Sequence, residues 1–313
     1  MMRFPIDAVI TWVDGSDPAH AGKMKKYAPE RVFTENDVAG ATRFANDGEI
    51  FWCVASIRKF APFIRKIWIV TDGQDPHIPE GSIPAEVVDH KQIFQGYEDY
   101  LPVFNSVAIE TMTWRIPGLA EHYVEFNDDF LLCRPAAPED FFAQDGTPVC
   151  HAVRSSILFD RFTRAIKKKE NGHRKVTFKG LMLNGAGLAG SHFCYLRLNH
   201  TPRPLNKVWF EEWYASHQDA LVRNISFRFR NPDQFTPQEL FYVSLWKNGR
   251  LDLRPVKGAL FYMETRSGKD YIRHKLERFH AGNYKYMCLN SMDRTAPEDR
   301  KLIENTVREL IGV

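Results

Sequence analysis

The chain has 313 residues, of which 44% are hydrophobic and 26% are charged, a composition typical of a soluble globular protein. Its formal charge of +3 is too small to indicate nucleic-acid binding, and its five scattered cysteines form no Cys-x-x-Cys pair, which argues against a disulfide framework or a zinc site. No stretch approaches the roughly 20 apolar residues of a membrane-spanning helix, and the N-terminal residues lack a signal-peptide pattern. We therefore expect a cytoplasmic protein, or one that contacts a membrane peripherally from its inner face.

The first half of the chain alternates short apolar runs with a helical pattern. Two of the runs end in similar acidic turns, "ITWVDGSDP" and "WIVTDGQDP". A helix is indicated where apolar residues recur at helical spacing and a proline follows. The predicted elements are, in order, strand 6–13, helix 46–61, strand 64–72, a short strand from 85, a helix within 104–116, and strand 122–132.

This order of elements predicts an open, mostly parallel sheet with helices on both faces. Ligands of such sheets bind outside the carboxyl ends of the strands. Asp14, Asp72 and the pair Asp128-Asp129 all follow predicted strands. We expect this acidic edge to hold a divalent cation and, through it, a diphosphate.

The second half of the chain differs in composition and in its predicted elements. Residues 161–179 are strongly basic and are interpreted as a mobile, solvated segment, with contact to an anionic polymer or membrane surface as the functional alternative. The segment "LMLNGAGLAG" is interpreted as small and flexible. Helices are predicted within 200–221, within 232–249, where Thr236 and Glu239 would form a capping box, and within 296–313.

The segment "EFNDDFLLCRP" carries the strongest chemical signal. Asn127, Asp128 and Asp129 offer the oxygen ligands that Mg²⁺ or Mn²⁺ prefers. A turn that bonds its own backbone explains the same residues equally well. For "WVDGSDP" taken alone, the turn explanation is the stronger of the two.

Other residues could serve phosphate or proton transfer. His200 is a candidate general base, although a lone histidine is more often structural. Arg228 and Arg230 would share one side of a predicted strand and could bind phosphate oxygens, or form salt bridges instead. The spacing of the glycines in "NGAGLAG" suits dinucleotide binding only if a strand precedes it and a helix comes after it, and the next segment, "SHFCYLRLNH", has the pattern of a strand. We therefore set an oxidoreductase aside.

Taken together, these segments resemble the Stealth family, sugar-1-phosphate transferases of bacterial capsule synthesis that are related to the animal GlcNAc-1-phosphotransferase. The resemblance implies one catalytic domain over residues 1–313, glycosyltransferase-A-like or Rossmann-like, with helical C-terminal additions and a variable basic insertion at about 152–198. It rests on four segments in order, at about 6–18, 43–135, 199–235 and 286–307.

The resemblance also implies roles for individual residues. Catalysis would fall to Asp128, Asp129, His200, Arg228 and Arg230, and substrate binding to Asp14, Gly15, Asp17, Asn105, Ser106 and Asn127. Of the two similar turns, only the first is expected to carry an essential carboxylate, because the family has an amide where Asp72 stands. The fourth segment has Asn290-Ser291 in place of Asn-Asp, which leaves Asn290 or Asp293 as a further metal ligand.

The activity implied by the resemblance is transfer of a sugar-1-phosphate from a nucleotide sugar, with UDP-GlcNAc the first donor to consider, to a hydroxyl of a saccharide acceptor. A nucleoside monophosphate would leave. Asp128 and Asp129 would hold Mg²⁺ or Mn²⁺, and His200 or one of these acids would accept the hydroxyl proton. Two alternatives stay open: a conventional glycosyltransferase that releases a nucleoside diphosphate, and a non-catalytic carbohydrate-binding subunit of a capsule assembly.

Overall fold

The computed structural model describes residues 4–27, 48–160, 176–264, 270–290 and 292–312. Most of the basic segment 161–179 therefore lies outside the described residues. None of the helices in the described ranges has the length and the apolar character that crossing a bilayer requires. All five cysteines are free thiols in this structure.

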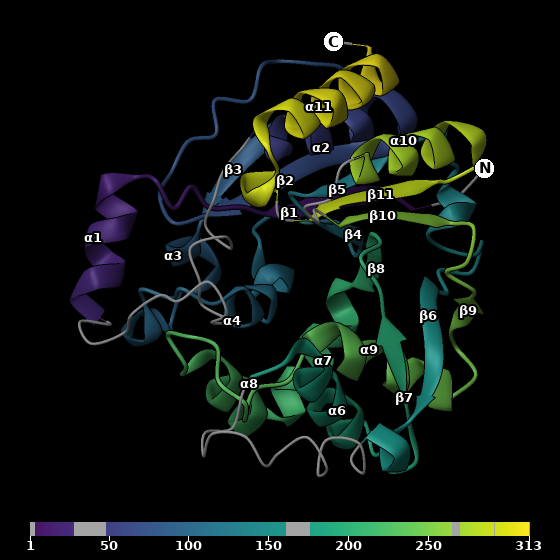
Figure 1. The fold of residues 1–313 in the computed structure, drawn as a ribbon. Coiled ribbons are helices and arrows are strands. Elements are labelled where there is room, and N and C mark those ends of the chain that lie inside the picture. Colours follow the sequence, from purple (N-terminus) through teal and green to yellow (C-terminus); the bar gives the residue numbers. More distant parts are fainter. Residues whose placement is uncertain (1–3, 28–47, 161–175, 265–269, 291, 313) are drawn as a thin grey trace.

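A five-stranded sheet in the order β3-β2-β1-β4-β8 forms the centre of the fold (Figure 1). Its first four strands are parallel, and only β8 runs antiparallel to its neighbour. The strands are β1 Ile6–Thr11, β2 Ile64–Thr71, β3 Ala85–Asp89, β4 His122–Asn127 and β8 Arg203–Asn206.

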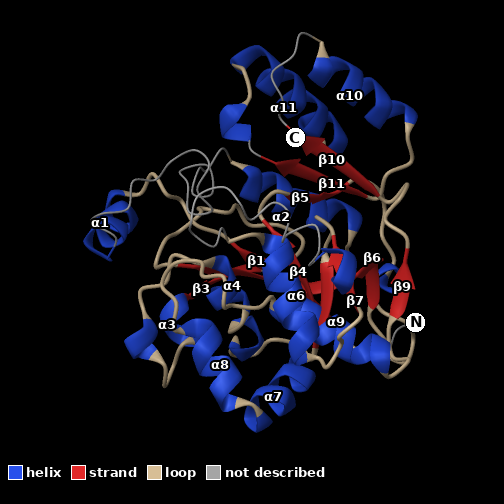
Figure 2. Ribbon diagram, turned by 60° about the horizontal axis from the view of Figure 1, so that its bottom comes forward, coloured by secondary structure: helices blue, strands red, loops and turns tan. Residues whose placement is uncertain are grey.

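Helices cover both faces of this sheet because its strands are apolar on both sides. Ala8 and Ile10 of β1 belong to a core that includes the apolar side of α2 (Glu49–Phe60), whereas Val9 belongs to the core on the opposite face. Figure 2 shows α7 and α8 on one side of the sheet and α10 and α11 on the other. The opposite core is built with α3 His90–Ile93, α4 Ser106–Glu110, α6 Phe178–Leu188, α7 Lys207–Ser216, α8 Gln218–Ile225 and α9 Pro237–Lys247. The predicted fold class is confirmed.

Two three-stranded sheets flank the central one. The first, in the order β10-β11-β5, packs against the C-terminal helices, which correspond to the predicted helical additions. The second has the order β7-β6-β9. Their elements are β5 Phe130–Leu132, β6 Val149–Ser156, β7 Cys194–Leu198, β9 Asp252–Arg254, β10 Leu260–Glu264, β11 Tyr286–Asn290, α10 Tyr271–Ala281 and α11 Pro297–Ile311.

The predicted strand 122–132 is two strands that belong to different sheets. β4 ends at Asn127 in the central sheet, and β5 begins at Phe130 in the sheet with β11. Asp128 and Asp129 form the turn between them, so the acidic pair lies where the chain passes from one sheet to the other. Because Thr11 of β1 pairs with Asn127, the turn after β1 lies beside it at the same edge of the central sheet.

Three local predictions are wrong. The helix predicted within 104–116 is only one short turn, α4, followed after a break by a 3-10 turn at Thr113–Arg115. Residues 226–231 do not form a strand, so Arg228 and Arg230 do not share a strand face. Thr236 stands at the N-cap of α9, but its side chain makes no capping bond, and the Glu239 carboxylate accepts a hydrogen bond from the Leu196 N–H.

The segment "LMLNGAGLAG" is also not flexible, because most of it lies in the buried helix α6. Thr177 caps this helix by accepting a hydrogen bond from the Gly180 N–H. Gly185 allows close packing on α9, because a Cβ at this position would lie 2.9 Å from the Thr236 carbonyl oxygen. Since the segment ends a helix rather than opening one after a strand, the dinucleotide alternative fails on geometry.

We predict opposite effects for alanine at two glycines of α6. Gly185→Ala should destabilise the protein by about 1–3 kcal/mol, because backbone of α9 blocks the new methyl group. Gly187→Ala is the matched control: nothing lies within 4 Å of its Cβ position, so the gain in helix propensity should stabilise by up to about 1 kcal/mol. Urea unfolding of both variants measures the difference. Equal effects would show that α6 and α9 are not in this close contact.

Candidate active site

The two similar turns, after β1 and after β2, are joined by hydrogen bonds at the edge of the central sheet. The Asp14 N–H donates to Gln74 Oε1 at 2.9 Å, and Gln74 Nε2 donates back to the Asp14 carbonyl at 2.8 Å. The Asp14 carboxylate accepts from the N–H and the hydroxyl of Ser16. Asp72 instead accepts from Lys23 and contacts the His20 ring, both in α1 (Pro18–Tyr27). The two carboxylates therefore have different roles: Asp14 bonds within its own turn, and Asp72 anchors α1.

Asp17 stands directly before α1 and caps its N-terminus. Its Oδ1 accepts from the N–H groups of Ala19 and His20. These bonds, that to His20 foremost, lower the pKa of the exposed Asp17 carboxyl. Gly15 lies in the turn between Asp14 and this cap. The predicted substrate-binding residues of this segment thus lie together in the turn after β1, which shares an edge of the central sheet with the acidic turn.

The turn Asn127–Asp129 holds oxygen atoms that the protein itself does not satisfy. Among the described residues, Asn127 Oδ1 and Asp129 Oδ1 are buried and have no hydrogen-bond partner. Burial, together with the charges of Asp129 and Glu49, raises the pKa of Asp128 well above its usual range. Burial likewise raises the pKa of Asp129 to about 6. Two adjacent carboxylates in this position are costly unless a cation joins them.

These oxygens fit a hard divalent cation. Mg²⁺ and Mn²⁺ take carboxylate and amide oxygens, and the turn presents two carboxylates and one amide oxygen at a strand end. The orphaned, buried oxygen atoms of Asn127 and Asp129 are what a site for such an ion would leave without protein partners.

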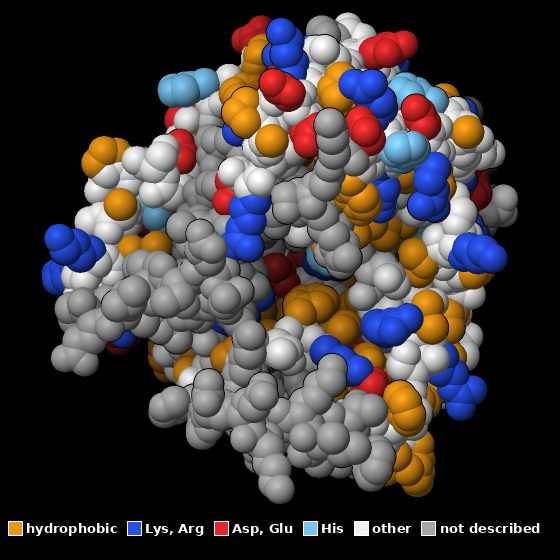
Figure 3. Space-filling view, in the orientation of Figure 1, with side chains coloured by type: hydrophobic (Ala, Val, Ile, Leu, Met, Phe, Trp, Pro, Cys, Tyr) orange, Lys and Arg blue, Asp and Glu red, His pale blue; other side chains and the backbone are white. Residues whose placement is uncertain are grey.

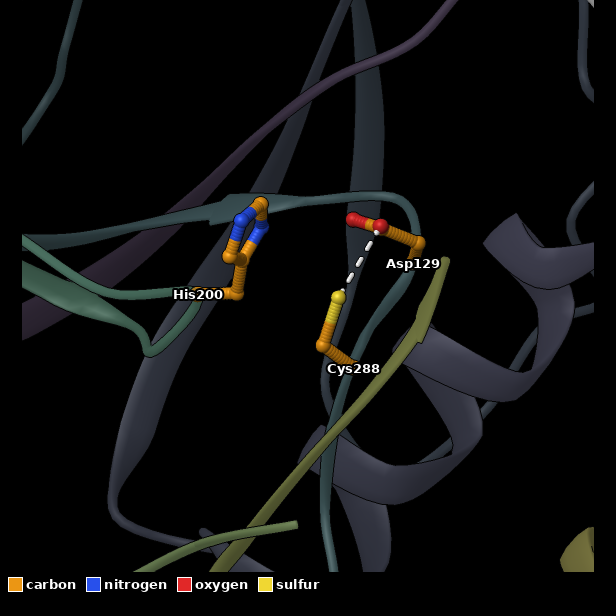
Figure 4. Close-up of side chains that lie close together, drawn as sticks. All are labelled: Asp129, His200 and Cys288. Atoms are coloured by element: carbon orange, nitrogen blue, oxygen red, sulfur yellow. Dashed lines mark hydrogen bonds between the residues drawn. The ribbon is translucent and has the colours of Figure 1, made fainter. Parts of the chain in front are cut away.

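His200 and Cys288 meet Asp129 from two other segments (Figure 4). His200 lies between β7 and β8, and Cys288 belongs to β11. The Cys288 thiol donates to Asp129 Oδ2 at 3.2 Å, and ligating atoms of the three side chains all lie within 4.8 Å of one another. His200, which the sequence singled out as a candidate general base, therefore lies next to Asp129, whereas Cys288 was not predicted.

The His200 ring lies against aromatic side chains. Its centroid is 4.9 Å from that of Tyr262 and 6.0 Å from that of Phe130. Burial, and secondarily the charge of Arg203, lowers the pKa of His200 to about 4. The imidazole is thus neutral at physiological pH and can accept a proton or coordinate a metal.

A buried polar network lies behind this cluster. Arg203 of β8 pairs with Glu125 of β4 at 3.1 Å, and Gln238 of α9 donates to both Glu125 and Glu110. Burial and the charge of Glu110 raise the pKa of Glu125 to about 7. Because Glu125 and Arg203 face each other across the two strands, this ion pair fixes β8, and with it His200, against β4.

The two predicted arginines make different contacts from each other. Arg228 donates to the carbonyls of Asp99 and Leu101 and lies 4.8 Å from the Tyr27 ring centroid. Arg230 donates to the Ser106 hydroxyl at 2.6 Å, and burial lowers its pKa. Within the described residues, no hydrogen bond or ion pair joins either arginine to Asp128, Asp129 or His200.

Asn105 is a structural residue in this arrangement. Its Oδ1 accepts from the Val107 N–H at the start of α4, and its Nδ2 donates to Gln234 and to the Phe227 carbonyl. Asn105 therefore holds the 227–234 loop in this structure, and its contact with substrate stays a prediction. Ser106, next to it, faces Arg230.

Asn290 ends β11, two residues beyond Cys288, and Asp293 follows in a 3-10 turn at Met292–Arg294. The end of β11 therefore reaches the same region as the acidic turn, because β11 pairs with β5 and the Leu289 N–H donates to the Asp129 carbonyl. A hollow near the centre of the face in Figure 3 shows acidic and histidine side chains at its floor, with hydrophobic side chains on its lower wall.

Several residues of the site escaped sequence reasoning. Cys288 looked like one of several scattered cysteines, and Glu125 and Arg203 looked like ordinary charges in "HYVEFN" and "TPRPLN". One signal was available: Glu125 is a charge at a position of a central parallel strand whose neighbours are all apolar, and such a charge requires a buried partner.

Comparisons with known proteins identify the family to which this chain is similar. Conserved regions 1 and 2 of the Stealth proteins match residues 4–31 and 43–150. The receptor polysaccharide phosphotransferase WefC of Streptococcus oralis is 32% identical over 306 residues, covering 91% of this chain and 90% of its own. An exopolysaccharide phosphotransferase of Streptomyces coelicolor is 43% identical over 306 residues, covering 95% of this chain and 53% of its own.

Among solved structures, the galactosyltransferase LgtC with donor and acceptor sugar analogues aligns with 98% of this chain and 95% of its own, at 12% identity and a TM-score of 0.46. A likeness this weak supports no conclusion about function. The segments predicted at 199–235 and 286–307, and the single domain over residues 1–313, stay predictions.

Proposed function

The chain belongs to the Stealth family, and from this premise we propose that it transfers a sugar-1-phosphate from a nucleotide sugar to a hydroxyl of a saccharide acceptor, in the synthesis of a capsular or extracellular polysaccharide. The observation that carries the proposal is the acidic turn Asn127–Asp129, with unsatisfied buried oxygen atoms next to a neutral histidine. Relatives named as polysaccharide phosphotransferases support the reaction class. UDP-GlcNAc is the donor to try first.

Each group of residues has a part in this reaction. Asp128, Asp129 and Asn127 would hold Mg²⁺ or Mn²⁺, with Asn290 as a further ligand, and the bound ion would neutralise charge on the diphosphate. The turn with Asp14, Gly15 and Asp17 would shape the wall next to the nucleotide sugar. Arg230, anchored by Ser106, would stabilise charge on the transferred phosphate. Arg228 is held by two carbonyls, so we assign it to shaping the loop.

Phosphoryl transfer needs positioning and neutralisation of charge more than covalent help from the protein. The acceptor hydroxyl oxygen would form a bond to the phosphorus attached to the sugar, while the bond between the two phosphates breaks and a nucleoside monophosphate leaves. We propose His200 as the group that takes the hydroxyl proton. A bound diphosphate would raise the low pKa of His200, because negative charge nearby favours the imidazolium form.

We predict that His200→Gln lowers kcat by about 10²–10⁴-fold while binding of the donor changes little. Glutamine keeps the size of the side chain and cannot take up a proton. His280→Gln, at an exposed position in the last turn of α10, is the control and should keep normal turnover. Steady-state kinetics with equilibrium donor binding measures both. A fall in donor affinity with unchanged kcat would assign His200 to binding instead.

The released nucleotide tests the proposed reaction. The protein is incubated with Mg²⁺, UDP-GlcNAc and short capsule-type oligosaccharides, and the nucleotides are separated by chromatography. UMP together with a phosphodiester-linked product supports sugar-1-phosphate transfer. UDP would mean attack at the sugar carbon, as in a conventional glycosyltransferase, and would overturn the proposal. Saccharide binding without turnover or metal dependence would favour a non-catalytic subunit.

The acceptor also bears on where the protein works. We propose that the protein acts on the cytoplasmic side of the membrane and meets the membrane or the capsule machinery through its acceptor. Sedimentation of the protein with vesicles, with and without acceptor, tests this part separately.

A further inference from the structure

The cluster of Asp129, His200 and Cys288 contains one feature that a magnesium site does not need, a thiol. Mg²⁺ binds oxygen ligands and disfavours sulfur, whereas Zn²⁺ and its neighbours bind thiolate, imidazole and carboxylate together. Here one side chain of each kind converges from three separate segments, the β4–β5 turn, the β7–β8 connection and β11 (Figure 4).

We propose that Asp129, His200 and Cys288 form a binding site for a thiophilic divalent transition-metal ion, of which Zn²⁺ is the representative, and that its occupation stops the transferase. The binding part stands on the geometry of the cluster alone. The inhibition part rests on the proposed function, because Asp129 would be taken from Mg²⁺ and His200 from the acceptor hydroxyl.

The distances suit such an ion. With bonds of about 2.3 Å to sulfur and about 2.0 Å to nitrogen or oxygen, the ligand atoms of a tetrahedral site with one sulfur lie about 3.3–3.5 Å apart. Cys288 Sγ and Asp129 Oδ2 are already 3.2 Å apart, and the ligating atoms of all three residues lie within 4.8 Å of one another. A shift of the His200 ring by no more than about 1.5 Å would therefore complete three corners of a tetrahedron.

A second observation points to a ligand at the same place. Asp129 Oδ1 is buried and, within the described ranges, has no hydrogen-bond partner. When the ion binds, the Cys288 thiol releases its proton to solvent and its sulfur bonds to the metal. The hydrogen bond from the thiol to Asp129 is then replaced by bonds from both groups to the ion. The fourth corner stays open to water, as in sites that are not purely structural.

Competition with magnesium follows from the shared carboxylate. Nitrogen and sulfur ligands favour Zn²⁺ over Mg²⁺ strongly, so a low Zn²⁺ concentration would displace a high Mg²⁺ concentration at Asp129. A zinc-loaded site would also hold the imidazole of His200, which could no longer accept a proton. Zinc would thus block both Asp129, a proposed Mg²⁺ ligand, and His200, the proposed proton acceptor.

Co²⁺ is the probe for binding, since cobalt–thiolate bonds absorb in the near ultraviolet and magnesium sites do not. The full-length protein, freed of metal by a chelator, is titrated with Co²⁺. We expect a thiolate-to-cobalt charge-transfer band that saturates at one equivalent and disappears on addition of one equivalent of Zn²⁺. Absence of this band in the folded wild-type protein would overturn the proposal.

Variants identify the ligands. Cys288→Ser should abolish the band and weaken Zn²⁺ binding by more than about 100-fold, since loss of an outer-shell partner alone costs 10- to 100-fold. His200→Gln should weaken the binding similarly. Cys150→Ser, at a buried cysteine of β6, is the matched control and should keep the band. A band that survives Cys288→Ser, or one lost with Cys150→Ser, would overturn the assignment.

Activity separates this inference from the proposed function. Zn²⁺ should inhibit release of UMP by the wild-type protein at a concentration that matches its displacement of Co²⁺. A protein that binds Co²⁺ through Cys288 but releases no UMP would refute the proposed function and leave the metal site standing. Transferase activity that Zn²⁺ does not inhibit at saturation of the site would refute the inhibition while leaving the function intact.

Discussion

Asp129→Asn is expected to reduce sugar-1-phosphate transfer by about 10²–10³-fold, the scale of losing one preorganised electrostatic group in an active site. The substitution removes a charge and keeps the shape of the side chain. It also keeps an oxygen that can accept the hydrogen bond of the Cys288 thiol. Loss of turnover would therefore come from the missing charge rather than from a rearranged site.

The same substitution should not weaken the fold. Burial raises the pKa of Asp129 to about 6, so the metal-free folded protein holds this proton more tightly than the unfolded chain, for which 3.8 is the ordinary value. Stability contributed by the protonated form is complete below pH 3.8 and is lost as the pH rises through 6. The amide in the Asp129→Asn variant cannot ionise, so at pH 8 the variant should be at least as stable as the wild type.

Kinetics and unfolding of the same preparation test both halves of this prediction. Asp145→Asn serves as the control, because Asp145 lies in an exposed turn where it accepts from the Thr147 N–H. The control should keep normal turnover, and Asp128→Asn should behave like Asp129→Asn. Near-normal activity of the Asp129→Asn variant would remove Asp129 from the proposed metal site.

The sequence was sufficient to predict the central parallel sheet and the acidic residues at the edge of that sheet. Apolar runs that end in acidic turns predicted the parallel strands and placed Asp14 and Asp128 at one edge, because strand ends of a parallel sheet are set by local pattern. The resemblance brought His200 to the acidic turn, and the structure has them together. Local sequence pattern and the family resemblance thus predicted the features that depend on a single strand and the turn that follows it.

What the sequence could not show depends on contacts between distant segments. Cys288 lies 159 residues from Asp129 and becomes part of the site only through the pairing of β11 with β5. Spacing rules for metal ligands apply to ligands on one local motif, so the scattered cysteines argued against any zinc-type site. Arg230 was predicted on a strand because the alternation of residues in "SFRFRN" is typical of one. In the structure this segment is a loop, which Asn105 and Gln234 hold by hydrogen bonds.

Arg203→Met is expected to destabilise the protein by about 3–5 kcal/mol, the usual result of removing one partner from a buried ion pair. Glu125 is 0% exposed and Arg203 is 6% exposed, so neither can turn to water. Without the guanidinium, Glu125 keeps Gln238 as a donor but faces the charge of Glu110 alone. Urea unfolding measures the loss, with Arg223→Met at an exposed position of α8 as the control, expected within about 0.5 kcal/mol of wild type.

The dependence of this loss on pH identifies its cause. The pKa of Glu125 is raised from 4.5 to about 7, so the wild-type protein gains stability from the proton below pH 4.5 and loses that part as the pH rises through 7. Arg203 opposes this shift by favouring the charged carboxylate. In Arg203→Met the pKa should rise further, so the destabilisation should be larger at pH 8 than at pH 5.5.

The double variant Glu125→Gln/Arg203→Met completes the test. Glutamine carries no charge, so most of the stability lost in Arg203→Met should return and the difference between pH 5.5 and pH 8 should vanish. A loss that is equal at both pH values, and that the second substitution does not restore, would mean that Arg203 acts through packing, including its contact 5.5 Å from the Phe130 ring centroid. In that case the buried pair would not be what holds β8 and His200 in position against β4.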